Sequence, residues 1–191
     1  MKSIAISGSP RENVGKRDAK ELRYEGKVPA VLYGGKTQVH FSVSATDLKG
    51  LVFTPDVQFV DLDVAGVITQ AIVQEVQFHP LTDLPLHVDF LALDAKKPVV
   101  MEIPVKLTGT SPGVKIGGKL VQKLRKLRVK ALPANMPQSV EVSITKLDVG
   151  KSVGVGELKF DGFVITNNPA DTIVSVTMSR ALKQAENDGK K

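Results

Sequence analysis

The sequence predicts a mainly β protein built from two domains, and three observations support this. Short runs in which apolar, often β-branched residues alternate with polar ones recur along the chain. Gly, Pro, Asn and Asp interrupt these runs at short intervals, as turn residues do. The 191 residues are enough for two small domains, each with its own apolar core.

The alternating runs predict strands in both halves of the chain. In the first half we expect strands over residues 2–7, 28–33, 39–43, 58–64, 67–78 and 86–93. In the second half we expect them over residues 99–107, 118–131, 139–144, 152–154, 164–167 and 172–178. Ala65-Gly66 separates two alternating runs, which predicts a β-hairpin turn at this point.

Helical signals are confined to two short segments. Residues 18–25 contain strong helix formers and are followed by Gly26, a residue type that commonly ends helices. Ser44 and Asp47 have the spacing of a capping box, so a second short helix is expected to run through Leu51.

A polar stretch at residues 94–98, which ends in a proline, predicts the boundary between the two domains. Residues 37–95 hold one Lys/Arg against eight Asp/Glu, a net charge of −7, whereas residues 96–191 hold seventeen against eight, a net of +9. We therefore expect a first domain over residues 1–95 and a second β domain over residues 96–180. Residues 181–191 have too little apolar content to pack and are expected to form a flexible polar tail.

Composition narrows the class of protein. The chain has no cysteine, which excludes disulfides and thiolate metal sites and favours a reducing cytosol. The apolar run after Met1 is too short for a signal peptide, and no apolar run reaches the about 18 residues of a membrane span. We expect a cytoplasmic protein with no membrane partner, and the net charge of +6 suggests an anionic one.

Enzyme motifs are weak, and we expect no catalysis and no cofactor. Residues 4–11 are similar to the strand and phosphate loop of flavodoxin-like, flavin-dependent reductases, which is an alternative function. That fold alternates strands with longer helices, and the later chain lacks this periodicity. His79, Asp83, His87 and Asp89 would bind a metal only if a turn gathered them, and ordinary hydrogen bonding is the simpler interpretation.

A dense group of basic residues near the start of the chain predicts an interface with a polyanion. Residues 1–36 hold eight Lys/Arg against four Asp/Glu, a net charge of +4. On a helix over residues 18–25, Lys20 and Arg23 are three residues apart and share a face. Arginine can form two hydrogen bonds at once with phosphate or guanine. A solvated basic surface without a partner is the alternative interpretation.

The order of residues in this segment resembles a known family. Arg11-Glu-Asn-Val-Gly15-Lys16 and Leu22-Arg23-Tyr-Glu-Gly26-Lys27-Val28-Pro29-Ala30-Val31-Leu32-Tyr33-Gly34-Gly35 are similar to the start of the bacterial 5S rRNA-binding ribosomal proteins of the general stress protein CTC family, large-subunit protein number twenty-five. The likeness continues through residues 74–80 and 86–90. Residues 117–120, 131–137 and 147–150 are similar to the longer, two-domain members, so nearly the whole chain is covered.

The resemblance implies an N-terminal six-stranded closed β-barrel with two short helices, followed by a second all-β domain. It also implies a structural constituent of the large ribosomal subunit that is cytoplasmic, ribosome-associated and not an enzyme. Its N-terminal domain would bind 5S rRNA, mainly in the wide minor groove and along the backbone. A stress-related protein-interaction module is a further alternative.

The resemblance also implies which side chains meet the RNA. The implied RNA-binding residues are Arg11, Lys16, Lys20, Arg23, Tyr33, Gly34, Gly35, Lys36, Gln74, Gln77, His87 and Asp89. The basic residues would contact phosphate or base edges, and Asp89 would accept hydrogen bonds from base amino groups. Arg17, Ala19 and Glu21 depart from the family pattern, so the contacts of the first helix remain open.

A second basic segment lies in the C-terminal half, where residues 119–130 hold six Lys/Arg and no acid. On one continuous strand Lys126, Arg128 and Lys130 would share a face, and the earlier basic residues would lie on the other face unless a bulge follows Arg125. A solvated β face is one interpretation. Contact with 23S rRNA or a neighbouring ribosomal protein is the other.

Overall fold

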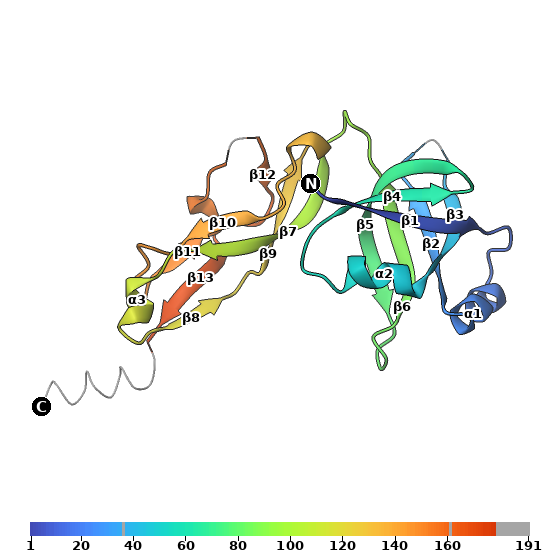
Figure 1. The fold of residues 1–191 in the computed structure, drawn as a ribbon. Coiled ribbons are helices and arrows are strands. Elements are labelled where there is room, and N and C mark those ends of the chain that lie inside the picture. The colour runs from blue at the N-terminus through green and yellow to red at the C-terminus, as the bar shows by residue number, and fades with distance from the viewer. Residues whose placement is uncertain (36, 161, 179–191) are drawn as a thin grey trace, which may run out of the picture. The chain divides into compact units, whose positions relative to one another are not determined.

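The computed structural model describes residues 1–35, 37–160 and 162–178 in two compact units. The first unit comprises Met1–Val99 and Leu132–Gln138, and the second comprises Val100–Ala131 and the described chain from Ser139 onward. The chain is mainly β, as predicted (Figure 1). Lys36 and the tail expected at residues 181–191 lie outside the described residues.

The first unit contains a closed barrel of six strands in the order β1-β3-β2-β6-β5-β4. The strands are β1 (Ser3–Pro10), β2 (Lys27–Tyr33), β3 (Val39–Ser44), β4 (Phe59–Val64), β5 (Val67–Phe78) and β6 (Pro85–Ala92). Strand β1 closes the barrel, because it pairs in parallel with β4 and antiparallel with β3. The six-stranded closed barrel implied by the resemblance is therefore present (Figure 1).

Alternation along the strands explains the core of the barrel. Leu32 on β2 and both Val88 and Phe90 on β6 belong to the buried cluster at the barrel centre. Phe41 of β3 packs against Phe90 in a tilted arrangement, with 5.7 Å between the ring centroids. The intervening residues of each strand face outward, and most of them are polar or exposed, although Val31 of β2 and Ile72 of β5 are apolar and buried.

Both predicted helices accompany the barrel, with ends shifted by one or two residues. Helix α2 (Ala45–Val52) begins after Ser44, whose side chain accepts a hydrogen bond from the Thr46 N–H at 3.4 Å. Its Leu48 and Leu51 are buried and join the barrel core. Helix α1 (Lys16–Tyr24) has no buried residue and lies beside β2. None of the helices in the described chain is long and apolar enough to cross a membrane.

The hairpin between β4 and β5 turns at Ala65 and Gly66, as predicted. Their φ angles are +55° and +81°, and two such angles in succession are typical of a type I′ turn. The left-handed conformation is strained for alanine, because its Cβ comes close to a carbonyl oxygen. The β4–β5 register continues on both sides of this turn, with Val64 paired with Val67.

The second unit contains two sheets, with the strand orders β10-β7-β9-β12 and β11-β13-β8. The strands are β7 (Val99–Thr108), β8 (Lys119–Gln122), β9 (Lys126–Ala131), β10 (Val140–Ser143), β11 (Ser152–Gly154), β12 (Val164–Ile165) and β13 (Thr172–Thr177). The chain also forms three short helical turns that the sequence patterns did not predict: α3 (Pro112–Lys115), η1 (Pro133–Asn135) and η2 (Val155–Glu157).

The single strand predicted over residues 118–131 is wrong. The chain forms β8 and β9 instead, and these strands lie in different sheets. The N–H of Leu124 donates to the carbonyl of Ile173 in β13 at 3.2 Å, whereas the carbonyl of Arg125 accepts from the N–H of Val105 in β7 at 2.9 Å. The backbone therefore changes its hydrogen-bonding partner between Leu124 and Arg125, and the basic segment is divided between two sheets.

The flavodoxin-like alternative is also wrong. That fold needs residues 4–11 to form a strand and a phosphate loop that leads into a helix. Instead β1 continues to Pro10, and Gly8, Ser9 and Pro10 pair with β3. The glycine and proline of the supposed loop are therefore part of a closed barrel, and no doubly wound parallel sheet is built on this strand.

Candidate nucleic-acid interface

The outer surface of β2, β6 and β5 carries a group of polar side chains that we call the polar face. Its members are Tyr33, Gln74, Glu75, Gln77, His87 and Asp89. Strand β6 lies in the middle, where Asp89 is paired with Val31 of β2 on one side and with Glu75 of β5 on the other. His87 is paired with Gln77. Paired residues on one surface of an antiparallel sheet have Cβ atoms about 4.5–5.5 Å apart, so these side chains are neighbours.

His87 and Asp89 form a close pair at the centre of the polar face. The distance from Nδ1 of His87 to Oδ1 of Asp89 is 2.7 Å, and each side chain is 30% exposed. A carboxylate that holds Nδ1 orients the imidazole ring and leaves Nε2 for another partner. The pair is therefore a fixed group of polar atoms that remains accessible from outside the barrel.

The Tyr33 hydroxyl shares this environment. Burial raises the pKa of Tyr33, and the negative charges of Asp89 and Glu75 raise that pKa further, since each disfavours a phenolate nearby. The hydroxyl is accordingly protonated at neutral pH and can donate a hydrogen bond. The polar face thus contains two carboxylates that can accept hydrogen bonds, those of Asp89 and Glu75. It also contains the Tyr33 hydroxyl as a donor and the His87 imidazole in a fixed orientation.

A β-bulge explains why Glu75, which the sequence patterns did not predict, belongs to the polar face. Val73 pairs with Phe90 and Glu75 pairs with Asp89, so Gln74 is the extra residue. Gln74 and Glu75 are both exposed, whereas Val73 and Val76 pack against the barrel core. The core-facing valines are three residues apart instead of two, and this break in alternation is the sequence signal for the bulge.

Helix α1 brings an exposed cation, Arg23, to the edge of the polar face and carries two more. Nε of Arg23 donates to the carbonyl of Leu86 at 3.0 Å, which ties the helix to β6 one residue before His87. Nζ of Lys20 lies 5.8 Å from the centroid of the Tyr24 ring, and Tyr24 is 80% exposed. Lys16 is exposed at the first position of the helix. Tyr24 is a second residue that the sequence patterns did not single out.

Arg11 is held within the protein. Its Nε donates to the Asp18 carboxylate at 3.2 Å, a terminal nitrogen pairs with the same carboxylate, and its side chain is only 9% exposed. A terminal nitrogen also donates to the carbonyl of Asn13 at 3.3 Å. These bonds fasten the loop before α1 to the first turn of the helix. Direct contact of Arg11 with RNA stays a prediction, and the observed geometry gives it a role in positioning α1.

Two glycines follow Tyr33, and the structure restricts the first position to glycine more strongly than the second. Gly34 has a φ of +88°, and a Cβ at this position would lie 2.5 Å from Cδ1 of Leu91, so both the backbone and the packing require glycine. At Gly35 the nearest atom to such a Cβ is 3.9 Å away. Gly34 and Gly35 are both exposed, and the third predicted residue of this loop, Lys36, is outside the described chain.

The structure therefore divides the predicted residues into groups. One group lies on the polar face: Tyr33, Gln74, Gln77, His87 and Asp89. Arg23 lies at its edge, Lys20 and Lys16 lie earlier on α1, and Arg11 is engaged with Asp18. The alternative metal set does not assemble, because across the described residues no three His, Cys, Asp or Glu side chains come close enough to hold a metal ion.

Comparison with known proteins identifies the family. Residues 6–90 match the model of the ribosomal L25p family, and residues 98–180 match the model of the C-terminal domain of ribosomal protein TL5. Three similar proteins are each named large ribosomal subunit protein bL25. They come from Cytophaga hutchinsonii (46% identical over 186 residues), Porphyromonas gingivalis (44% over 187) and Phocaeicola vulgatus (45% over 192), and each alignment covers 97% of both chains. The chain therefore belongs to the ribosomal L25p family, in the two-domain form with a TL5-type C-terminal domain, and not to a family of enzymes.

Proposed function

We propose that the chain is a structural constituent of the large ribosomal subunit in the cytoplasm and that its N-terminal barrel binds 5S rRNA. The names of the relatives support the first part, since they are large-subunit proteins that match over 97% of their length. The observation that carries the second part is the polar face on β2, β6 and β5, which has the exposed Arg23 of α1 at its edge.

The charges of the polar face indicate which part of the RNA it meets. Glu75 and Asp89 are paired across β5 and β6, and a phosphate placed between two carboxylates would be repelled. Carboxylates instead accept hydrogen bonds from the exocyclic amino groups of bases. In an A-form helix the base edges are accessible from the wide, shallow minor groove. The polar face is therefore assigned to base edges, with Asp89 and Glu75 as acceptors.

The cations of α1 are assigned to the phosphates. Arg23 uses Nε to donate to the Leu86 carbonyl, and its two terminal nitrogens can still donate to a partner. Lys20 and Lys16 precede it on the same helix and are exposed. Phosphate contacts fix the orientation of a protein on RNA, whereas contacts with base edges select the sequence. The two groups thus have separate roles in one interface.

Binding measurements with the full chain test this proposal. We expect 5S rRNA to bind more tightly than a plain A-form RNA duplex of equal length. Asp89→Asn should weaken binding of 5S rRNA roughly 5- to 150-fold, the range of about 1–3 kcal/mol for a base contact, and should leave the salt dependence unchanged. Lys20→Gln should instead reduce the slope of log K against log salt by about 0.7–0.9, the value for one phosphate contact.

Asp61→Asn is the matched control, because Asp61 also lies on the outer surface of the barrel but on β4. It removes the same charge from the same unit and should not change binding. Equal affinity for 5S rRNA and the plain duplex, or equal effects of Asp61→Asn and Asp89→Asn, would contradict the assignment of the polar face.

A further inference from the structure

Strand β9 of the second unit presents a row of cations on one surface. Leu127, Val129 and Ala131 are at most 5% exposed, and the residues between them, Lys126, Arg128 and Lys130, are exposed on the opposite side. Alternate residues of a strand lie about 7 Å apart, so the three cations form an evenly spaced line along the sheet. We call the surface formed by Lys126, Arg128 and Lys130 the β9 basic face.

The strands beside β9 neutralise little of this charge. On the β7 side, Glu102 pairs with Arg128 at 3.4 Å. On the β12 side, Val164 is paired with Lys130 and is 66% exposed. Among the residues that the structure describes, no carboxylate forms an ion pair with Lys126 or Lys130. The β9 basic face therefore keeps an excess of positive charge.

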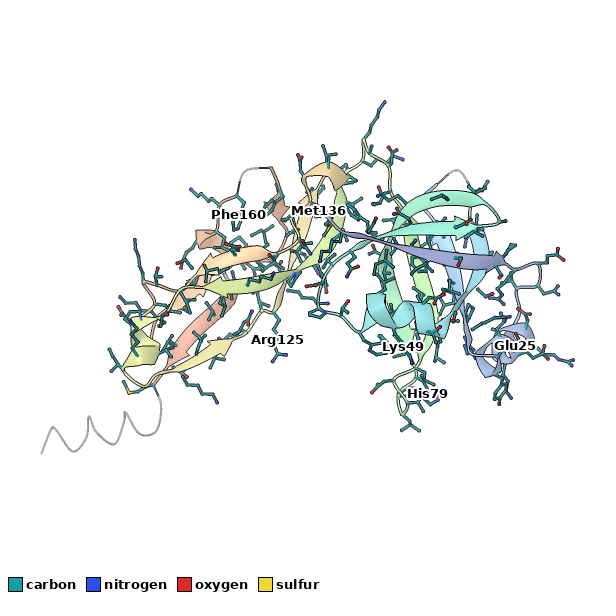
Figure 2. The ribbon with its side chains drawn as sticks, viewed as in Figure 1. Glu25, Lys49, His79, Arg125, Met136 and Phe160 are labelled. Atoms are coloured by element: carbon teal, nitrogen blue, oxygen red, sulfur yellow. The ribbon has the colours of Figure 1, made fainter. Side chains whose placement is uncertain are left out.

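Further along the sheet, the charge of the next outward-facing cation, Lys106, is offset by a neighbouring carboxylate. Lys106 of β7 is the register partner of Glu141 on β10, so the net charge of this surface is concentrated on β9. The chain before β9 adds to the excess, because Lys123 and Arg125 are exposed where the backbone passes from one sheet to the other. Figure 2 shows the Arg125 side chain projecting away from the ribbon at this crossing.

The composition of this surface favours a polyanion over an ordinary protein partner. Lysine is depleted in protein–protein interfaces, where aromatic residues, methionine and arginine are enriched. Here two of the three outward residues of β9 are lysines, and no aromatic residue lies between them on the strand. A line of cations about 7 Å apart suits a repeating phosphate backbone, because the two lysines act as point charges and the arginine can form two hydrogen bonds with one phosphate.

We propose that the β9 basic face binds the phosphate backbone of a second RNA segment, distinct from the RNA held by the polar face of the barrel. The chain then has two RNA-binding surfaces of different kinds. The polar face selects base edges, and the β9 basic face contacts phosphates without selecting sequence. A chain with both surfaces can hold two RNA segments at once.

The test is formation of a ternary complex by the full chain. A 1:1 complex of the chain with 5S rRNA is first isolated free of excess RNA, and a labelled 20-base-pair RNA duplex of plain A-form geometry is then added at low salt. We expect the duplex to join the complex. The variant Lys126→Gln/Arg128→Gln/Lys130→Gln should retain 5S rRNA and lose the duplex by at least tenfold in affinity. Its slope of log K against log salt for the duplex should fall by about 2–3, the value for three phosphate contacts.

The matched control is Lys115→Gln/Lys146→Gln/Lys159→Gln, which removes the same three charges from exposed positions of the second unit outside β9. It should bind the duplex as the unaltered chain does. Failure of the isolated 1:1 complex to bind the duplex, or equal losses in both triple variants, overturns the inference. Displacement of the duplex by poly-glutamate at equal charge also overturns it, because the surface would then accept any acidic polymer.

The two proposals fail in different ways in this experiment. If the unaltered chain binds the duplex and does not bind 5S rRNA, the proposed function is contradicted and the β9 basic face is still supported. Retained 5S rRNA binding without a ternary complex contradicts the β9 basic face alone. Thermal unfolding of each variant, followed by circular dichroism, confirms that the substituted chains are folded before either conclusion is drawn.

Discussion

Replacing Gly34 by alanine tests the loop that follows Tyr33. The change places an L-residue at a φ of +88°, which costs roughly 1–2 kcal/mol. The new Cβ would lie 2.5 Å from Cδ1 of Leu91, so the leucine must leave its rotamer at a further cost of about 0.5–1.5 kcal/mol. We therefore expect the free energy of unfolding of the barrel to fall by about 1.5–3.5 kcal/mol.

Tyrosine fluorescence in a urea titration measures this effect on the barrel alone. The chain has no tryptophan, and both of its tyrosines, Tyr24 and Tyr33, lie in the first unit. With a urea dependence of about 1–3 kcal/mol per molar, the midpoint should fall by roughly 0.5–3.5 M. Gly35→Ala is the control, because its Cβ would have no neighbour closer than 3.9 Å and its φ is not positive.

A double variant separates the two contributions to this loss. In a Leu91→Ala background the overlap is absent, so Gly34→Ala should cost only about 1–2 kcal/mol, the contribution of the backbone. Equal midpoints for the Gly34→Ala and Gly35→Ala chains would refute the reasoning, since neither the positive φ nor the contact with Leu91 would then affect stability.

Three further predictions concern other parts of the barrel. Asp89→Asn in a Tyr24→Phe chain should lower the pKa of Tyr33, because one of the charges that raise it is removed; a pH titration of phenolate absorbance measures this, and an unchanged pKa contradicts it. Ala65→Asn should stabilise the chain by about 0.5–1 kcal/mol in urea titration, since asparagine tolerates the left-handed turn better than alanine, and a lower midpoint would argue against the type I′ turn. Arg11→Ala should speed amide hydrogen exchange in α1 and leave the barrel strands protected, and uniform exchange rates would show that Arg11 does not fasten the helix.

Local patterns were sufficient for much of the barrel. The hairpin at Ala65-Gly66 follows from two alternating runs separated by two residues that suit a tight turn, and β5 has the bounds that alternation predicts. The cap at Ser44 was also predictable, because a serine hydroxyl just before a helix commonly accepts a hydrogen bond from a backbone N–H in the first turn. These features depend on neighbours in sequence, which is why a single sequence reveals them.

Features that depend on distant partners were not predictable in this way. The switch of sheets at Leu124–Arg125 depends on Ile173 and Val105, and neither is near in sequence. The pairing of Arg11 with Asp18 joins the two sides of the loop before α1, whereas charge alone suggested that Arg11 was available to a partner. The residues assigned to RNA came from the family resemblance, and the barrel register then explains why those on β2, β5 and β6 lie on one surface.

The parallel pairing of β1 with β4 has a consequence for synthesis on the ribosome. Because translation proceeds from the N-terminus, Ser3–Pro10 emerges early, yet one of its edges has no partner until Phe59–Val64 has also emerged. The nascent chain must carry an open strand edge through this interval, a state in which unpaired backbone groups are exposed to other chains. The polar face needs β6 as well, so the surface proposed to bind RNA is incomplete until Ala92 has emerged.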